Sequence, residues 1–108
     1  MTILVDMDGV ICTEQRTFER CLATVIPGAR EALEALVAAG HTIVIYSARS
    51  WSELKMTKAW LEENKIPHHG IHLGKPVADC IIDDRAMRFN GWKSILNDLG
   101  VEKPSPQE

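Results

Sequence analysis

The sequence predicts an α/β fold, an open sandwich built on a central parallel sheet. Short apolar runs rich in β-branched residues alternate along the chain with segments of helical periodicity. Each apolar run stops abruptly at a polar or acidic residue, as a buried strand does. This order of strand, helix and strand is typical of a parallel sheet with crossover helices. Because 108 residues suit a single domain, we expect one domain over residues 1–102 and a disordered polar tail over residues 103–108.

The first elements are predicted from the apolar pattern. Residues 2–6 are expected to form a buried strand, because β-branched and apolar residues there end in acid and glycine. Residues 12–26 have a mixed pattern and are expected to be a loop with at most one helical turn. A helix follows Pro27, and Gly40 lies where a left-handed C-terminal cap belongs. The apolar residues of this helix share one face: Ala32, Leu33, Leu36 and Val37.

A second strand and helix follow. Residues 41–46 are nearly all β-formers and predict a central strand covered on both faces. Ser52 is expected to cap the next helix, which Pro67 prevents from continuing.

The last elements are shorter. Residues 70–73 predict a short strand, and the apolar run over residues 78–82 predicts a fourth strand that stops at two aspartates. A final helix begins near Trp92 and closes at Gly100.

Composition and charge narrow the function classes. Hydrophobic residues at 45% and charged residues at 25% suit an ordinary globular protein. No apolar run approaches the roughly 20 residues of a membrane-spanning helix, and the N-terminus lacks the features of a signal peptide. We therefore expect a soluble, cytoplasmic protein without a membrane partner. The net charge of −3 gives no support for nucleic acid as a partner. The cysteines lack a CxxC spacing and are expected to be free thiols: Cys12, Cys21 and Cys80.

Reactive residues gather where the predicted strands end. In open parallel sheets, ligands bind beyond the carboxyl ends of the strands. All four predicted strand ends carry residues suited to phosphate or metal chemistry. In strand order these residues are Asp6 with Asp8, Ser47, Lys75, and Asp83 with Asp84.

These residue types match the needs of phosphoryl transfer, which are a nucleophile, charge neutralisation and a proton for the leaving group. Asp6 can attack phosphorus and form an aspartyl phosphate. Asp8 can protonate the leaving group and then deprotonate water. Clustered carboxylates call for a cation, and Mg²⁺ prefers oxygen ligands. We expect Asp6, Asp83 and the backbone carbonyl of Asp8 to bind it, with Asp84 as an alternative to Asp83 or as its partner.

The phosphate itself needs donors. The Ser47 hydroxyl and the Lys75 ammonium are expected to face its oxygens. Gly9 lets the chain turn away from the first strand, which leaves nearby backbone N–H groups free to donate. The expected backbone donors belong to Met7 and Ala48.

This order of motifs resembles the haloacid dehalogenase superfamily of phosphohydrolases over almost the whole chain. The resemblance implies a three-layer Rossmann-like core and a magnesium-dependent phosphatase. It implies that Asp6 is the nucleophile and Asp8 the acid and base. The connections between motifs are too short for a cap domain, so the chain is similar to uncapped members of the superfamily. The matching residues are Asp6-Met7-Asp8-Gly9-Val10, Ser47, Lys75 and Asp83-Asp84.

Residues beside the motifs are candidate substrate contacts. Arg49 and Arg85 follow motifs closely and could reach substrate or pair with a nearby acid. Trp51 lies near the same end of the second strand, although most tryptophans are core residues. A transition-metal site is disfavoured because the histidines at 68, 69 and 72 lack cysteine partners and a helical spacing.

The sequence therefore predicts a Mg²⁺-dependent phosphomonoester hydrolase, acting on a small phosphorylated substrate such as a sugar phosphate. The sugar phosphate comes from the resemblance of residues 46–49, 74–79 and 82–86 to small phosphatases of capsular polysaccharide and sugar-phosphate metabolism. Phosphate on a nucleic-acid end or phosphoprotein, and transfer to an acceptor other than water, are the alternatives. A receiver-like domain is less favoured because the lysine precedes the last acidic pair, and a non-catalytic binding module is less favoured because every expected catalytic position is filled. A homo-oligomer that covers an uncapped site is consistent with the sequence.

Overall fold

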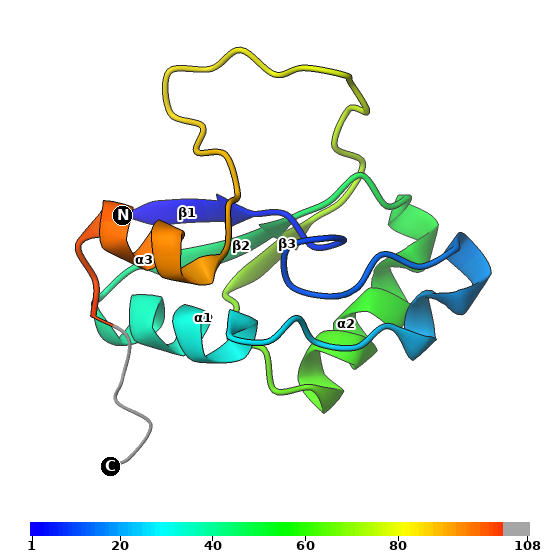
Figure 1. Ribbon diagram of the computed structural model, residues 1–108. Coiled ribbons are helices and arrows are strands. Elements are labelled where there is room, and N and C mark those ends of the chain that lie inside the picture. Colours follow the sequence, from blue (N-terminus) through cyan, green and yellow to red (C-terminus); the bar gives the residue numbers. More distant parts are fainter. Residues whose placement is uncertain (103–108) are drawn as a thin grey trace.

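The computed structural model of the protein describes residues 1–102, and the expected tail over residues 103–108 lies outside them (Figure 1). Its sheet has three parallel strands in the order β1-β2-β3. The strands are β1 (Thr2–Val5), β2 (Thr42–Tyr46) and β3 (Gly70–His72). The α/β class, with a parallel sheet and β2 in its centre, is confirmed.

Helices connect the strands. The α-helices are α1 (Ala29–Ala38), α2 (Leu54–Glu63) and α3 (Trp92–Leu99), and the short 3-10 helices are η1 (Thr17–Leu22) and η2 (Trp51–Glu53). The expected helical turn within residues 12–26 is η1. None of the helices in the described part of the chain is long and apolar enough to cross a bilayer.

The predicted C-terminal glycines end two of the helices, but one predicted N-terminal cap is misplaced. Gly40 and Gly100 follow α1 and α3 with φ angles of 96° and 71°, a left-handed conformation that glycine adopts without strain. The predicted cap at Ser52 is wrong. Ser50 is the N-cap of η2 and forms a capping box with Glu53, so the turn that leads into α2 begins two residues earlier.

One face of the sheet carries the core. Ile3, Val5, Ile43, Ile45 and Ile71 alternate with residues of the other face, because successive side chains of a strand point to opposite sides. Helices from the whole chain pack against this face in a single cluster. The helical members of that cluster include Leu33, Leu36, Trp60, Leu61, Trp92 and Leu96.

The opposite face of the sheet is open. Leu4 is 58% exposed, and its partner in the register, Val44, is only half-buried, as is Tyr46. No residue of this face belongs to the buried core cluster in the described chain. Residues 1–102 therefore form two layers, and the predicted three-layer arrangement with β2 covered on both faces is not seen in them.

The predicted fourth strand over residues 78–82 is wrong. The segment between β3 and α3 has no strand, and it arches away from the helices (Figure 1). Ile81 and Ile82 in this segment are 59% and 97% exposed. An apolar run forms a strand only where a neighbouring strand offers hydrogen bonds. Among the described residues β1 pairs with β2 alone, so residues 78–82 do not use its outer edge.

Candidate active site

The site residues predicted after β1, β2 and β3 lie at the carboxyl edge of the sheet, where those strands end. Backbone hydrogen bonds hold the loops after β2 and β3 together. The N–H of Lys75 donates to the Ser47 carbonyl, and the N–H of Gly74 donates to the Arg49 carbonyl, each at 2.9 Å. The loop that carries Lys75 is thereby fixed beside the loop that carries Ser47.

Asp6 and Lys75 meet at this edge. The distance between Lys75 Nζ and Asp6 Oδ2 is 3.7 Å, and the Asp6 side chain is 40% exposed. The other carboxylate oxygen, Oδ1, accepts a hydrogen bond from the Met7 N–H at 2.8 Å. One oxygen of Asp6 is thus oriented by the backbone, while the other faces a cation and solvent.

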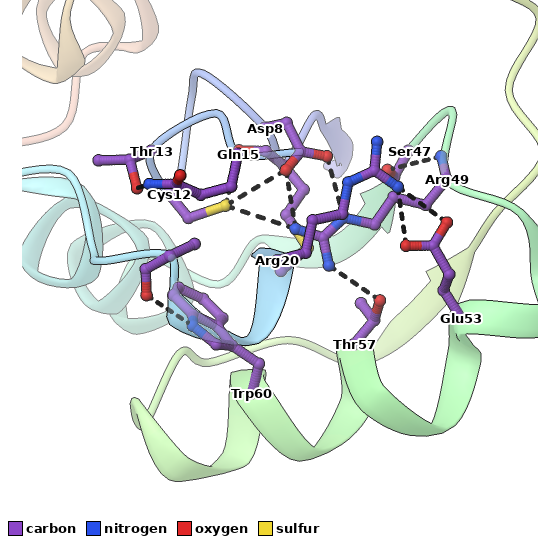
Figure 2. A network of polar contacts seen from close by, with 12 residues as sticks. Asp8, Cys12, Thr13, Gln15, Arg20, Ser47, Arg49, Glu53, Thr57 and Trp60 are labelled. Atoms are coloured by element: carbon purple, nitrogen blue, oxygen red, sulfur yellow. Dashed lines mark hydrogen bonds and ion pairs between the residues drawn. The ribbon is translucent and has the colours of Figure 1, made fainter. Parts of the chain in front are cut away.

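Asp8 points to a different place, into a buried network with Arg49 (Figure 2). Arg49 Nη2 donates to Asp8 Oδ1 at 2.7 Å and Arg49 Nε donates to Asp8 Oδ2 at 2.9 Å, so the pair is bidentate. Arg49 Nη1 donates to Thr57 Oγ1 on α2 at 3.0 Å, and the Cys12 thiol donates to Asp8 Oδ1 at 3.7 Å. Arg49 is only 2% exposed. It therefore positions Asp8 and does not reach out to a substrate as the sequence allowed.

The network sets the protonation of its members. Burial raises the pKa of Asp8, but the hydrogen bond and charge of Arg49, with a contribution from Arg20, outweigh it and leave the pKa of Asp8 below its usual value. Burial, together with the negative charge of Asp8, raises the pKa of the Cys12 thiol to about 12. At neutral pH Asp8 is a carboxylate and Cys12 is a thiol.

Two of the predicted phosphate donors, Ser47 and the Met7 N–H, already have hydrogen-bond partners within the protein. Ser47 is 1% exposed, and its hydroxyl accepts a hydrogen bond from the Arg49 N–H at 3.1 Å. The Met7 N–H bonds Asp6, as described above. Ala48 is exposed at the turn between Ser47 and Arg49. Lys75 is the donor that the structure places beside Asp6.

The predicted magnesium ligands are not brought together. Asp83 and Asp84 lie in the exposed segment between β3 and α3, where Asp83 accepts a hydrogen bond from the Arg85 N–H and Asp84 lies 3.6 Å from Arg85 Nε. Residues 1–102 contain no cluster of three or more His, Cys, Asp or Glu side chains that could hold a metal ion. As they lie, these residues do not fit a Mg²⁺ ion. The Arg85 side chain pairs with Asp84 of its own segment, one of the two roles that the sequence left open.

Trp51 lies at the edge of the site. It is half-exposed, packs edge-on against His72, and lies against Gly74, the residue before Lys75. Sequence reasoning missed the ion pair that supports it. Arg20 from η1 donates to both carboxylate oxygens of Glu53 in η2, at 2.7 and 2.8 Å. No local pattern signals this pair, because its members are distant in the sequence.

The site is an open surface. Two shallow hollows of the protein lie elsewhere, one beside β3 and α2 and one at the C-terminal end of α3. Neither hollow is lined by Asp6, Asp8 or Lys75. A ligand at Asp6 would therefore be held by the surface that surrounds this residue, with its far end accessible to solvent.

No family model and no curated protein matches this chain. A solved structure does: the crystal structure of a structural-genomics target from Vibrio cholerae superposes with a TM-score of 0.69. The match covers 81% of this chain and 82% of that chain, at 24% sequence identity. At this identity the similarity shows the fold alone. Most of the present chain therefore adopts a fold that is also found in that protein.

Proposed function

We propose that the protein is a phosphomonoester hydrolase in which Asp6 is the nucleophile. The observation that carries the proposal is the arrangement of Asp6 and Lys75 at the carboxyl edge of a parallel sheet, where ligands of such sheets bind. One Asp6 oxygen is fixed by the Met7 N–H and the other is accessible beside a lysine. The resemblance of the motif order to haloacid dehalogenase phosphohydrolases supports the same reading.

In the proposed reaction a carboxylate oxygen of Asp6 attacks phosphorus and the bond to the leaving oxygen breaks. The product is an aspartyl phosphate, and the leaving oxygen takes up a proton. Water then attacks the phosphorus of this intermediate, loses a proton to a base, and releases inorganic phosphate with a free Asp6. The Lys75 ammonium supports both steps because it offsets negative charge on the phosphoryl oxygens.

Asp8 is the proposed proton carrier, and its carboxylate would have to turn from Arg49 toward the leaving oxygen to act there. Its environment favours one of its two roles. The bidentate pair with Arg49 holds Asp8 as a carboxylate, which suits a base that accepts a proton from water. The same pair makes Asp8 a weak proton donor to the leaving group. Substrates whose leaving group needs little protonation, such as aryl phosphates, are therefore expected to react fastest.

The proposed enzyme depends on Mg²⁺ only if an acidic residue of the exposed segment can join Asp6. The segment over residues 74–91 would have to bring Asp83 or Asp84 to Asp6, because the described residues form no metal cluster as they lie. A bound Mg²⁺ would supply positive charge for the phosphoryl oxygens. The exposure of this segment is consistent with such a movement, since few contacts would have to break.

Hydrolysis of p-nitrophenyl phosphate with Mg²⁺ tests the proposed function. Wild type should release phosphate, and Asp6→Asn should lower kcat by at least about a thousandfold, since the nucleophile is lost. Asp98→Asn is the matched control, because Asp98 is an exposed carboxylate on α3 far along the chain from the site. Labelled phosphate should be trapped on wild type and on Asp98→Asn but not on Asp6→Asn. An inactive wild type over a broad panel of phosphates, or an Asp6→Asn variant as active as wild type, would refute the proposal.

The second candidate is a phosphatase of a larger substrate, such as a nucleic-acid end or a phosphoprotein. The exposure of Asp6 favours it, because 40% of this side chain is accessible and neither of the two hollows described above encloses it. Comparison of kcat/KM for a free nucleotide, a sugar phosphate, a phosphopeptide and a 3′-phosphorylated oligonucleotide separates the two candidates.

A further inference from the structure

Trp51 differs from the other tryptophans of the protein. Trp60 and Trp92 are buried, and each donates its indole N–H to a backbone carbonyl at 2.9 Å. Trp51 instead exposes 50% of its surface. Since burying an indole ring is favourable, a ring left exposed at a candidate active site points to a ligand that covers it.

The exposed ring is held in place by its neighbours. Its centroid lies 5.5 Å from that of His72 at an interplanar angle of 81°, and His72 lies 5.5 Å from Tyr46. Its five-membered ring borders Gly74, where an added Cβ would come within 3.1 Å of Trp51 Nε1. Trp51 is therefore wedged between the end of β3 and the loop that follows it.

The backbone beneath Trp51 is also fixed. Trp51 begins η2, whose N-terminus is closed by the capping box of Ser50 and Glu53. Glu53 is held in turn by Arg20, whose Nη1 donates to both carboxylate oxygens (Figure 2). A ring fixed in this way loses little conformational entropy when a ligand stacks on it.

Contacts connect Trp51 to the reactive residues. Gly74, which Trp51 touches, directly precedes Lys75, and Lys75 Nζ lies 3.7 Å from Asp6 and 5.6 Å from the centroid of the Tyr46 ring. Asp6, Lys75, Gly74 and Trp51 therefore follow one another along the carboxyl edge of the sheet. A leaving group that extends from a phosphoryl group at Asp6 along this edge toward Gly74 would reach the indole.

We propose that Trp51 is a specificity-determining platform for a substrate whose leaving group carries a ring with a flat, non-polar face. The proposal rests on the phosphatase function proposed above. Sugar rings and nucleobases both present such a face, and an indole stacks on it without hydrogen bonds. An open-chain leaving group has no such face and would leave Trp51 exposed.

Three substrates test the effect of the ring at a constant type of leaving group. All three release a primary alkyl oxygen, and only the first two carry a ring: glucose 6-phosphate, adenosine 5′-monophosphate and glycerol 3-phosphate. The Trp51→Ala variant should lower kcat/KM about tenfold for one or both ring-bearing substrates. It should leave glycerol 3-phosphate within about twofold of wild type, and Trp51→Phe should keep most of the activity because the platform remains. The ring-bearing substrate whose kcat/KM falls in Trp51→Ala shows whether the platform binds a carbohydrate or a nucleobase. An equal loss on all three substrates, or no loss on any, overturns the platform and leaves the phosphatase proposal standing.

Binding gives a readout that is independent of turnover. Because Trp60 and Trp92 are buried, acrylamide should quench chiefly the fluorescence of Trp51. In the Asp6→Asn variant, a ring-bearing phosphate should protect this fluorescence and glycerol 3-phosphate should not. If wild type hydrolyses none of the three substrates, the same measurement on wild type decides the platform, and the broad phosphate panel decides the phosphatase proposal. Selective protection would then support a ring-binding surface, and its absence would overturn it.

Discussion

Replacement of Arg49 by methionine tests the buried ion pair with Asp8. Methionine retains the flexible, unbranched stem of arginine but is shorter and carries no charge. The substitution removes both hydrogen bonds to the Asp8 carboxylate and the one to Thr57. Asp8, whose side chain is only 18% exposed, would keep its desolvation cost without the cation that offsets it.

The expected loss follows from this geometry. Breaking a buried ion pair by removing one partner costs about 3–5 kcal/mol. We expect the lower end, a fall of about 3 kcal/mol in the free energy of unfolding, because Asp8 retains some contact with water. A domain with a stability of about 5–15 kcal/mol would remain folded after such a loss. Urea unfolding followed by far-UV circular dichroism measures it, with the m-value as a check on two-state behaviour.

Arg85→Met is the matched control, because it removes the same charge from an exposed pair. Arg85 and Asp84 have side chains that are 90% and 89% exposed. This variant should lie within about 0.5 kcal/mol of wild type. If Arg49→Met destabilised the protein no more than Arg85→Met does, the buried pair would not contribute the stability expected of it.

The pair also predicts a dependence on pH. The folded state holds the pKa of Asp8 below its unfolded value, with Arg49 outweighing the effect of burial. The resulting stabilisation is fully present above the unfolded pKa and is lost as the pH falls through the folded pKa. Wild type should therefore lose stability on acidification below about pH 4. In Arg49→Met the largest influences that lower the pKa of Asp8 are lost, and burial is opposed only by the smaller ones of Arg20 and Cys12. Protonation of Asp8 should therefore cost that variant less stability than it costs wild type, and the stability gap between the two proteins should narrow in acid.

Further predictions concern thiols, the exposed segment and a helix end. Cys21 and Cys80 are exposed and should react rapidly with a disulfide reagent. Cys12 is buried, its pKa is raised, and it should react only on unfolding. Rapid reaction of all three thiols in the native protein would contradict the burial of Cys12. Trypsin should cut the native protein first within residues 74–91, which are largely exposed. Mg²⁺ should slow that cleavage if Asp83 and Asp84 bind it. Cleavage that Mg²⁺ does not affect would count against a magnesium site at these residues. Gly100→Ala should lower the free energy of unfolding by about 1 kcal/mol, because its φ of 71° is unfavourable for alanine, and an unchanged urea midpoint would show that the helix end relaxes.

Local patterns predicted most of the regular elements. The apolar stripe of α1 and the β-branched run of β2 each determine one element with neighbours close in the sequence. The fourth strand failed because the apolar run over residues 78–82 resembles a strand without having a partner in the described residues. A strand depends on hydrogen bonds to another strand, and an apolar pattern does not contain them.

In the candidate site, too, some features follow from the sequence and others only from the tertiary structure. The sequence by itself determined the residue types at the strand ends, including Asp6 and Lys75, because each follows directly from the end of its strand. Only the tertiary structure decided that Arg49 is buried against Asp8 and that Arg20 supports the turn of Trp51. These pairs join side chains that are distant along the chain, and their energies depend on burial and distance, which a linear sequence does not specify.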